Sequence, residues 1–248
     1  MKHIRIHDEI FAAFPHYRRG LVVATGLHNV GQASELEHLL SVTIEDTKTR
    51  PLDLAEDHRF TSWDQAHRTF GSNPNKYPPA HKALRKRAQR PGGQIPFINK
   101  AVAIMSYGSI IGCLPVGGDD LEKMSNQLEI RRTQSEDRFI PLGQPEKIEA
   151  PEPNEVVYAS PNGAVMCRRW NWRNSHGSAI SEQSTSILMN IDGISQDDEQ
   201  RVLAIRDQIA EMLSKYCAAQ VETYWLHPGR SSLTLDPSRA QARGREVA

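Results

Sequence analysis

The fold is decided at one short stretch of sequence, Leu114-Pro115-Val116-Gly117-Gly118-Asp119-Asp120-Leu121. It directly follows residues 97–111, which are apolar almost all round and therefore predict a buried helix. Before the stretch, apolar residues recur mainly at helical spacing; after it, they form short runs bounded by Gly, Pro, Asn and Asp, as strands do. No clear linker separates the two halves, so we expect one α+β domain over residues 1–226.

The remaining apolar pattern predicts the other elements of this domain. In the first half it indicates a strand at 21–27 and helices at 33–49, 60–70 and 79–90. In the second half it indicates a helix at 196–217 and strands at 128–130, 138–142, 156–159, 164–168, 186–191 and 221–226. Residues 227–248 are rich in Arg, Ser, Pro and Gly and poor in apolar side chains, so we expect a flexible C-terminal tail.

Composition excludes several classes of protein. The 248 residues carry 30 Lys and Arg against 30 Asp and Glu, so binding to a nucleic acid must come from a local basic patch. The three cysteines form no CxxC pair, which disfavours a zinc site and a disulfide scaffold and favours a reducing, cytoplasmic location. The N-terminus lacks an export signal, and Ser, Gly and Pro interrupt the longest uncharged run, 101–118, so no membrane association is expected.

The Gly117-Gly118 pair has two interpretations. Adjacent glycines allow backbone N–H groups to approach a ligand or an oxyanion closely. They also suit a left-handed turn that merely ends the preceding helix. A phosphate-binding loop is excluded, because the pattern GxxxxGK[ST] is absent.

Two stretches have the composition of a nucleic-acid surface. The predicted helix at 79–90 carries five basic residues with no acid among them: Lys82, Arg85, Lys86, Arg87 and Arg90. Such a group is usually a solvated face, but it can also hold a phosphate backbone in register. Residues 167–176 combine three arginines with two tryptophans, which suits stacking on unpaired RNA bases, although these side chains can equally pack at a sheet edge.

Common catalytic arrangements are absent from the sequence. It has no GxSxG or HExxH motif, and its ten histidines show no metal-ligand spacing with Cys or acidic residues. Cys113 and Cys167 have apolar neighbours, which favours buried thiols over nucleophiles. No cofactor and no metal are therefore expected.

Several motifs follow one another in a specific order: Phe70-Gly71, Asn75-Lys76-Tyr77, Ile98-Asn99-Lys100-Ala101-Val102, the 114–121 stretch, Glu155-Val156-Val157-Tyr158-Ala159 and Cys167-Arg168-Arg169-Trp170-Asn171-Trp172-Arg173. In this order, over about residues 63–224, the chain resembles the tRNA-binding and editing domain that the third and fourth B modules of the phenylalanyl-tRNA synthetase beta subunit form. The resemblance implies a β-barrel-like or mixed sheet core flanked by helices. It also implies a pocket for the aminoacylated 3′ end of a tRNA.

A free-standing domain of this kind would be a trans-editing aminoacyl-tRNA deacylase, acting on tyrosine attached to phenylalanine tRNA or on a related error. It would not be a complete ligase, because the adenylate-forming domain is missing. We expect the backbone N–H groups of Gly117 and Gly118 to donate to the oxyanion and Asp120 to orient the water. Asp119 is expected to bind the α-ammonium group or to orient the water together with Asp120. The other expected substrate-binding residues are Asn99, Asn171, Arg173, Thr185 and Asn190, and the expected tRNA-binding residues are Lys82, Arg85, Lys86, Arg87, Arg90, Arg168 and Arg169.

Two positions depart from the synthetase pattern. The histidine of the synthetases falls on Gly117, and their glutamate, thought to meet the tyrosine hydroxyl, falls on Asn190. Asn donates or accepts a hydrogen bond but carries no charge, so the amino acid removed can differ from tyrosine. The alternative is a module that binds tRNA or an amino acid without hydrolysis. DNA is not an expected partner, and the sequence indicates no oligomeric state.

Overall fold

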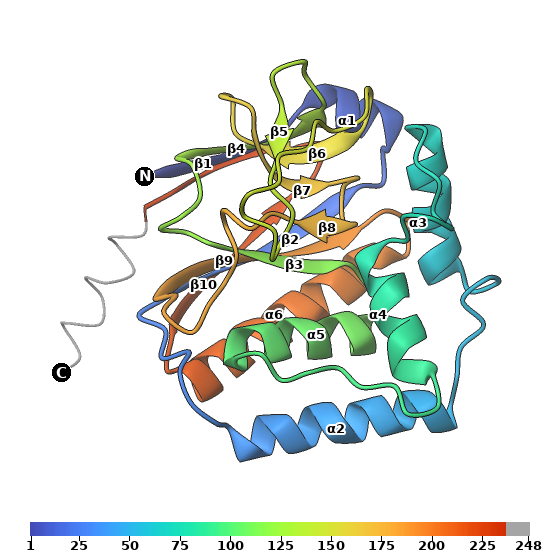
Figure 1. Ribbon diagram of the computed structural model, residues 1–248, viewed down its shortest axis with the longest axis vertical. Helices are drawn as coiled ribbons and strands as arrows, with labels where there is room; N and C mark the ends of the chain where they lie inside the picture. Colours follow the sequence, from blue (N-terminus) through green and yellow to red (C-terminus); the bar gives the residue numbers. More distant parts are fainter. Residues whose placement is uncertain (237–248) are drawn as a thin grey trace.

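The chain forms three layers. The computed structural model describes residues 1–236 and confirms the α+β class. A four-stranded sheet lies between a layer of helices and a second, mixed sheet (Figure 1). Among the described residues, no helix combines the length and the hydropathy that crossing a bilayer requires.

Both sheets are open. The four-stranded sheet has the antiparallel order β10 (Gln220–Leu226), β2 (Arg18–Thr25), β9 (Ser186–Gly193) and β3 (Val116–Asp120). The seven-stranded sheet has the order β11 (Ser232–Leu235), β1 (Lys2–Ile6), β4 (Gln127–Arg132), β6 (Val156–Ala159), β7 (Ala164–Arg168) and β5 (Arg138–Phe139), with β8 (Arg173–Asn174) also paired to β7. Neither sheet closes on itself over residues 1–236, so the mixed sheet is confirmed and the barrel-like closure is not formed.

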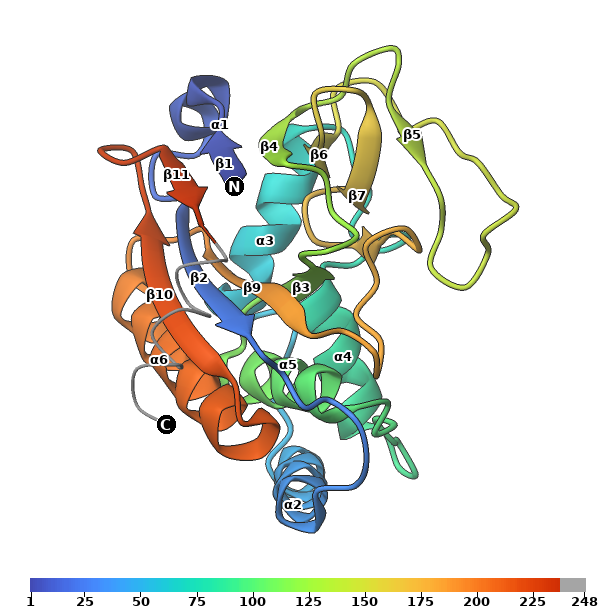
Figure 2. The ribbon, with the colours of Figure 1, turned by 90° about the vertical axis from the view of Figure 1, so that its left-hand side faces the viewer.

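The helices divide between two places. Helices α5 (Lys100–Gly112) and α6 (Asp198–Cys217) cover the four-stranded sheet, and α2 (Ser34–Thr49) lies against α5 on the side away from that sheet (Figures 1 and 2). Helix α4 (Ala80–Gln89) packs beside α2 and α5. The short α1 (Asp8–Ala13) and α3 (His58–Thr69) flank the seven-stranded sheet (Figure 1).

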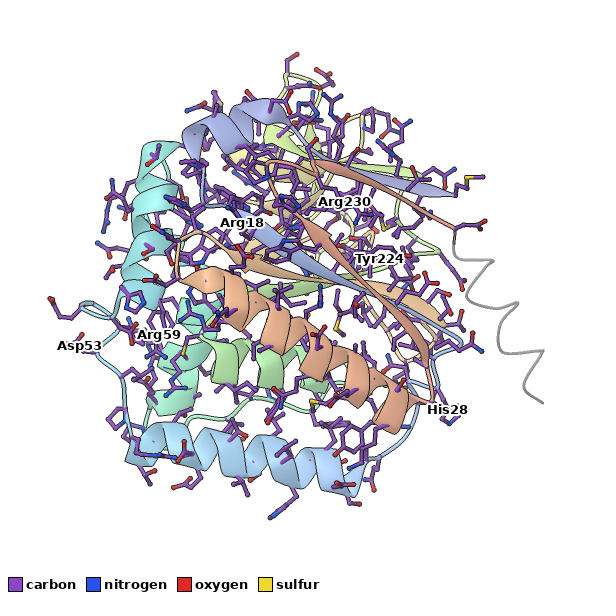
Figure 3. All side chains as sticks on the ribbon, turned by 180° about the vertical axis from the view of Figure 1, so that it is seen from behind. Arg18, His28, Asp53, Arg59, Tyr224 and Arg230 are labelled. Atoms are coloured by element: carbon purple, nitrogen blue, oxygen red, sulfur yellow. The ribbon has the colours of Figure 1, made fainter. Side chains whose placement is uncertain are left out.

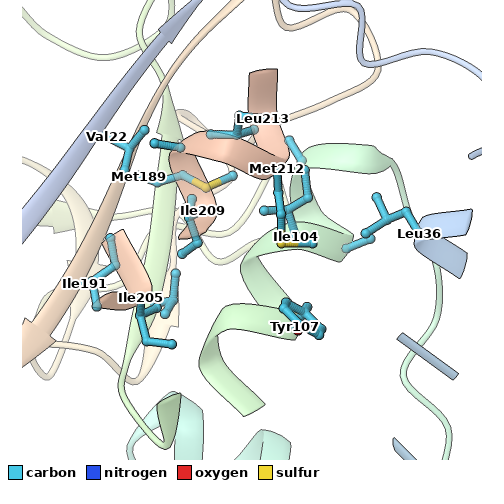
Figure 4. Close-up of a cluster of buried hydrophobic side chains, with 14 of the residues drawn as sticks. Val22, Leu36, Ile104, Tyr107, Met189, Ile191, Ile205, Ile209, Met212 and Leu213 are labelled. Atoms are coloured by element: carbon cyan, nitrogen blue, oxygen red, sulfur yellow. The ribbon is translucent and has the colours of Figure 1, made fainter. Parts of the chain in front are cut away.

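Side-chain alternation on the four-stranded sheet builds two cores. On β2, Val22 and Ala24 face α5 and α6, where Ile104, Ile205 and Ile209 complete the first core (Figure 4). The alternate residues Leu21 and Val23 face the other sheet and join a second core around Trp63 and Trp170. Because the central strands β2 and β9 are buried on both faces, they contain continuous apolar runs rather than alternating patterns.

Most predicted elements are confirmed, with end points shifted by a few residues. Five elements were not predicted: β1, α1, β3, β8 and β11. The expectation of a flexible tail from residue 227 is wrong for its first part, because β11 pairs with β1 and buries Leu233 and Leu235. Residues 237–248 of that expected tail lie outside the described residues.

Candidate active site

The two glycines of the 114–121 stretch lie within a strand. Helix α5 ends at Cys113, which takes the left-handed conformation at φ +49°, and β3 begins three residues later. In the antiparallel register Gly117 lies opposite Asn190. The Leu121 N–H donates to the Ser186 carbonyl and the Asp192 N–H donates to the Pro115 carbonyl, so the odd-numbered residues of this segment are the ones that bond to β9. The Gly117 N–H therefore points into the ladder, while the Gly118 N–H points away from β9.

A single close contact joins the two positions at which the chain departs from the synthetase pattern. A Cβ atom on Gly117 would lie 3.2 Å from the amide atoms of Asn190, so the Asn190 side chain fills the space that a side chain at 117 would enter. Asn190 is 4% exposed, and its Nδ2 lies 3.4 Å from Asp192 Oδ2. A side chain at position 117 would therefore require the Asn190 side chain to shift.

Asp119 is a buried carboxyl on the same face of β3 as Gly117. Ser178 Oγ donates to Asp119 Oδ1 at 2.5 Å. Burial raises the pKa of Asp119 to about 6, against the opposing effects of the Ser178 hydrogen bond and of the Arg19 charge. A carboxyl with this pKa takes up or releases a proton near neutral pH, as a general base must.

A small pocket opens beside Ser178. Its volume is about 150 Å³, and its lining combines apolar and polar side chains, among them Ile140, Met166, Lys123, Ser175 and Ser178. This volume is below the usual range for a whole small-molecule ligand, so the pocket suits a side-chain-sized group. The hydroxyl of Ser178 connects the pocket to Asp119.

Behind these residues a charged network joins the two sheets. Asp192 on β9 accepts two hydrogen bonds from Arg19, at 2.7 and 2.9 Å, one from Tyr17 at 3.0 Å and one from Tyr158 on β6. Asp192 and Arg19 are fully buried. Sequence reasoning missed this network, because Tyr17 and Arg19 lie more than 130 residues before Tyr158 and Asp192 in the chain and no local motif marks any of the four.

Three of the predicted site residues have structural partners in place. Asn99 caps α5 by accepting from the Val102 N–H at 2.9 Å. Asp120 accepts from the Glu122 N–H at 2.9 Å and from Ser184 Oγ at 2.6 Å and pairs with Lys123, so both of its oxygens are engaged. Thr185 is exposed and donates to Glu122.

Arg168 and Arg169 lie in a tight, buried turn. Arg168 binds Glu155 at 2.5 Å and Glu149 at 2.9 Å, and Arg169 lies 3.2 Å from Glu155 and stacks on Tyr77 at 3.7 Å. Arg169 and Trp170 have positive φ, and Trp170 is fully buried. This placement favours a structural role for the two guanidinium groups over the phosphate contacts expected from the sequence.

The neighbouring aromatic side chains remain partly exposed. Trp172 packs edge-on against Tyr77 at 4.8 Å, and Arg173 lies 5.9 Å from the Trp172 ring with no ion pair to any described residue. Asn174 Nδ2 approaches the Gly118 carbonyl at 3.5 Å, which joins this surface to β3. Asn171 instead faces inward, where its Oδ1 lies 3.1 Å from His67 Nε2, and its Nδ2 has no hydrogen-bond partner among residues 1–236.

The basic helix is only partly a surface. Arg85 is 9% exposed and donates to Gln89 and to the Ile110 carbonyl, and Lys82 pairs with Asp64. Lys86, Arg87 and Arg90 are exposed. Three of the five predicted phosphate-binding cations therefore face solvent.

Metal ligands do not gather anywhere in the described part of the chain, where no three His, Cys, Asp or Glu side chains come together. The cysteines are buried, and desolvation raises the pKa of Cys113 and Cys167, so neither is an activated thiolate.

Comparison with known proteins identifies the family. One of the similar solved structures is an N-terminal fragment of the phenylalanyl-tRNA synthetase beta subunit from Pyrococcus horikoshii, with 9% identity, a TM-score of 0.46, and 88% of this chain and 49% of that chain covered. The chain thus spans about half the length of that fragment. No curated protein matches. The family model of the B3/4 domain matches residues 62–221, more than half of the sequence, and the chain therefore belongs to the B3/4 domain family.

Proposed function

We propose that this protein binds the aminoacylated 3′ end of a tRNA and hydrolyses the ester of a mischarged amino acid. The observation that carries the proposal is the arrangement on β3, where the outward N–H of Gly118 neighbours the buried carboxyl of Asp119. Membership in the B3/4 family, together with the ordered motifs in which the sequence resembles the synthetase editing domain, supports an aminoacyl-tRNA as the substrate class.

The aromatic surface beside β3 would receive the terminal adenosine. Trp172, packed edge-on against Tyr77, offers a ring face on which a base stacks, and Arg173, which has no ion pair to any described residue, offers a cation to a phosphate. The contact from Asn174 to Gly118 places this surface next to the outward N–H. The exposed Lys86, Arg87 and Arg90 would hold the acceptor stem electrostatically.

The hydrolytic step requires few groups, because an aminoacyl ester is already activated. Water attacks the ester carbonyl carbon, and the Gly118 N–H donates to the oxygen that becomes negative. The proton of the water passes through the Ser178 hydroxyl to Asp119, 2.5 Å away. The carbon–oxygen bond to the ribose then breaks. The proton held by Asp119 passes back through Ser178 to the leaving ribose oxygen, which regenerates the carboxylate, and the free amino acid departs.

Release of amino acid from charged tRNAs tests this function. Trace protein is added to a panel of correctly and incorrectly charged tRNAs, beginning with tyrosine on phenylalanine tRNA. We expect turnover of at least one mischarged species and a loss of rate of about a hundredfold or more in Asp119→Asn, because a general base contributes 10²–10⁴-fold. Asp198→Asn changes an equally buried carboxyl at the start of α6 and should keep the wild-type rate.

A second candidate is a module that binds the charged tRNA without hydrolysing it. The observation that favours it is the Asn190 side chain at Gly117, which fills the space of the absent histidine. Such a module protects the ester, so a tRNA that loses its amino acid more slowly with protein than in buffer would decide for binding alone and against the deacylase.

A further inference from the structure

A second pocket lies at the C-terminal end of α5, where α2, α3 and α4 meet. Its volume is about 340 Å³, and none of its residues belongs to the candidate active site. The lining contains three arginines, Arg50, Arg59 and Arg85, and one carboxylate, Asp46, together with hydroxyl, thiol and apolar groups. The lining therefore carries an excess of positive charge.

Arg85 is the innermost of these cations. It is 9% exposed, and among the described residues it forms no ion pair. Gln89 Oε1 accepts from its Nε at 2.9 Å and the Ile110 carbonyl accepts from its Nη1 at 3.3 Å, which fixes the plane of the guanidinium. Gln89 also exchanges hydrogen bonds with the backbone of Leu52, so the loop before α3 is tied to the same group. A buried guanidinium without a carboxylate is costly unless an anion joins it.

Arg59 approaches from the first turn of α3, at its lower end in Figure 3. Asp57 holds its Nε at 2.8 Å and leaves Nη1 without a partner among the described residues. Arg59, Arg85 and Cys113 line the same pocket, which places the two guanidinium groups at one site. Arg50 stands at the rim, 77% exposed, where Asp46 accepts from its Nε at 2.8 Å.

We propose that this pocket binds a phosphate group. Guanidinium groups bind phosphate oxygens in charge-assisted, often bidentate pairs, and two arginines held in place by Gln89 and Asp57 are already ordered for such contacts. The phosphate belongs either to an RNA backbone or to a small phosphorylated molecule. The inference does not depend on the proposed hydrolysis, since it uses none of the same residues.

Titration with inorganic phosphate tests the site. The Nε–Hε resonances of the arginines are followed by NMR, at constant ionic strength against chloride. Saturable shifts are expected for Arg59 and Arg85 and none for Arg131 and Arg168, whose guanidinium groups are already bound by buried carboxylates. Absence of saturable shifts at Arg59 and Arg85 would show that Arg85 only binds the end of α5, and would overturn the proposal.

Matched variants then locate the site. Arg59→Gln should weaken phosphate binding about tenfold, whereas Arg68→Gln, which removes the same charge from an exposed position on α3, should not. Arg85→Lys is a second variant. It keeps the positive charge but loses the paired N–H donors of the guanidinium group, and it should also weaken phosphate binding. If Arg59→Gln and Arg68→Gln weaken phosphate binding equally, the effect comes from the net charge of the protein, and the proposal that this pocket binds phosphate is wrong.

The same variants separate the two sources of phosphate. An acceptor-stem RNA hairpin and inorganic pyrophosphate serve as probes. If Arg59→Gln weakens the hairpin more than Arg68→Gln does, the phosphate is that of an RNA backbone. If Arg59→Gln weakens only the binding of pyrophosphate, the site binds a small phosphorylated molecule. Loss of deacylation in Asp119→Asn leaves either result unchanged, so this proposal and the proposed function fail separately.

Discussion

At the scale of single residues, Asp119 sets how the proposed activity depends on pH. Its pKa is raised to about 6, so the group is protonated below pH 6 and cannot accept a proton from water there. We expect the rate constant for deacylation, after subtraction of the buffer blank, to rise with pH, to reach half its maximum near pH 6 and to stay level above it. A profile that is flat across pH 6 would remove Asp119 as the base.

The contact between Asn190 and Asp192 gives a second prediction at this scale. Asn190→Asp places a second carboxylate beside a buried one, 3.4 Å from the present amide, and two adjacent carboxylates resist ionisation. The free energy of unfolding should therefore fall by about 2 kcal/mol or more at pH 8 and by less at pH 5, where the new carboxyl is protonated. Asn190→Ser, which is neutral, should show the same loss at both pH values in urea unfolding.

The residue scale also shows where sequence reasoning reaches its limit. Arg168 and Arg169 have the composition of an RNA-binding surface, but both pair with Glu155 on the preceding segment, and Arg168 also pairs with Glu149. The backbone of Arg169 and Trp170 takes positive φ in this turn, which no local pattern indicates. The sequence predicts backbone N–H donors at Gly117 and Gly118, because glycine lets a ligand approach the backbone closely. Only the strand register shows that the Gly117 N–H points towards β9 and that the Gly118 N–H does not.

At the scale of elements, helices with a clear apolar period were predictable and short or polar strands were not. Helix α2 and strands β6 and β7 were predicted within one residue of their observed ends. Strand β3 was missed because Gly-Gly-Asp-Asp has low strand propensity, and only pairing with β9 makes it a strand. Strand β1 was missed because charged and polar residues dominate it, and β11 was missed because its four residues lie in a polar segment; each buries its apolar residues once the two pair.

Helices α3 and α4 carry two buried histidines that predict acid sensitivity. Burial lowers the pKa of His67 to about 4 and that of His81 to about 3, while both are near 6.5 in an unfolded chain. Below pH 6.5 the unfolded state therefore binds more protons than the folded state. The free energy of unfolding is at its full value above pH 6.5 and falls as the pH decreases from 6.5 towards the folded-state pKa values of about 4 and about 3. His81→Gln should reduce the slope of unfolding free energy against pH below 6.5 by up to about 1.4 kcal/mol per pH unit, and the exposed His38→Gln should not.

The exposed side of α4 gives a prediction for RNA binding. Replacing Lys86, Arg87 and Arg90 by Ala should weaken binding to charged tRNA and lower the magnitude of the slope of log K against log salt by up to about 2 to 3, since each phosphate contact contributes roughly 0.7–0.9. Removal of three cations elsewhere, Arg5, Lys147 and Lys215, is the matched control and should leave the slope near its wild-type value. An equal change in both triple variants would count against α4 as the contact surface.

At the scale of the whole molecule, the Asp192 network makes the two sheets one folding unit. Arg19 and Asp192 belong to the four-stranded sheet, and Tyr158 belongs to the seven-stranded one. Arg19→Met leaves a buried carboxylate without its cation and should cost about 3–5 kcal/mol of unfolding free energy. The double variant with Asp192→Leu should cost less than the sum of the two single variants, because no charge then remains buried.

Denaturant unfolding followed by the fluorescence of the buried tryptophans between the sheets and by far-UV circular dichroism measures this cycle. In every variant the two signals should change together, and separate transitions would show that the sheets unfold independently and that the network does not join them.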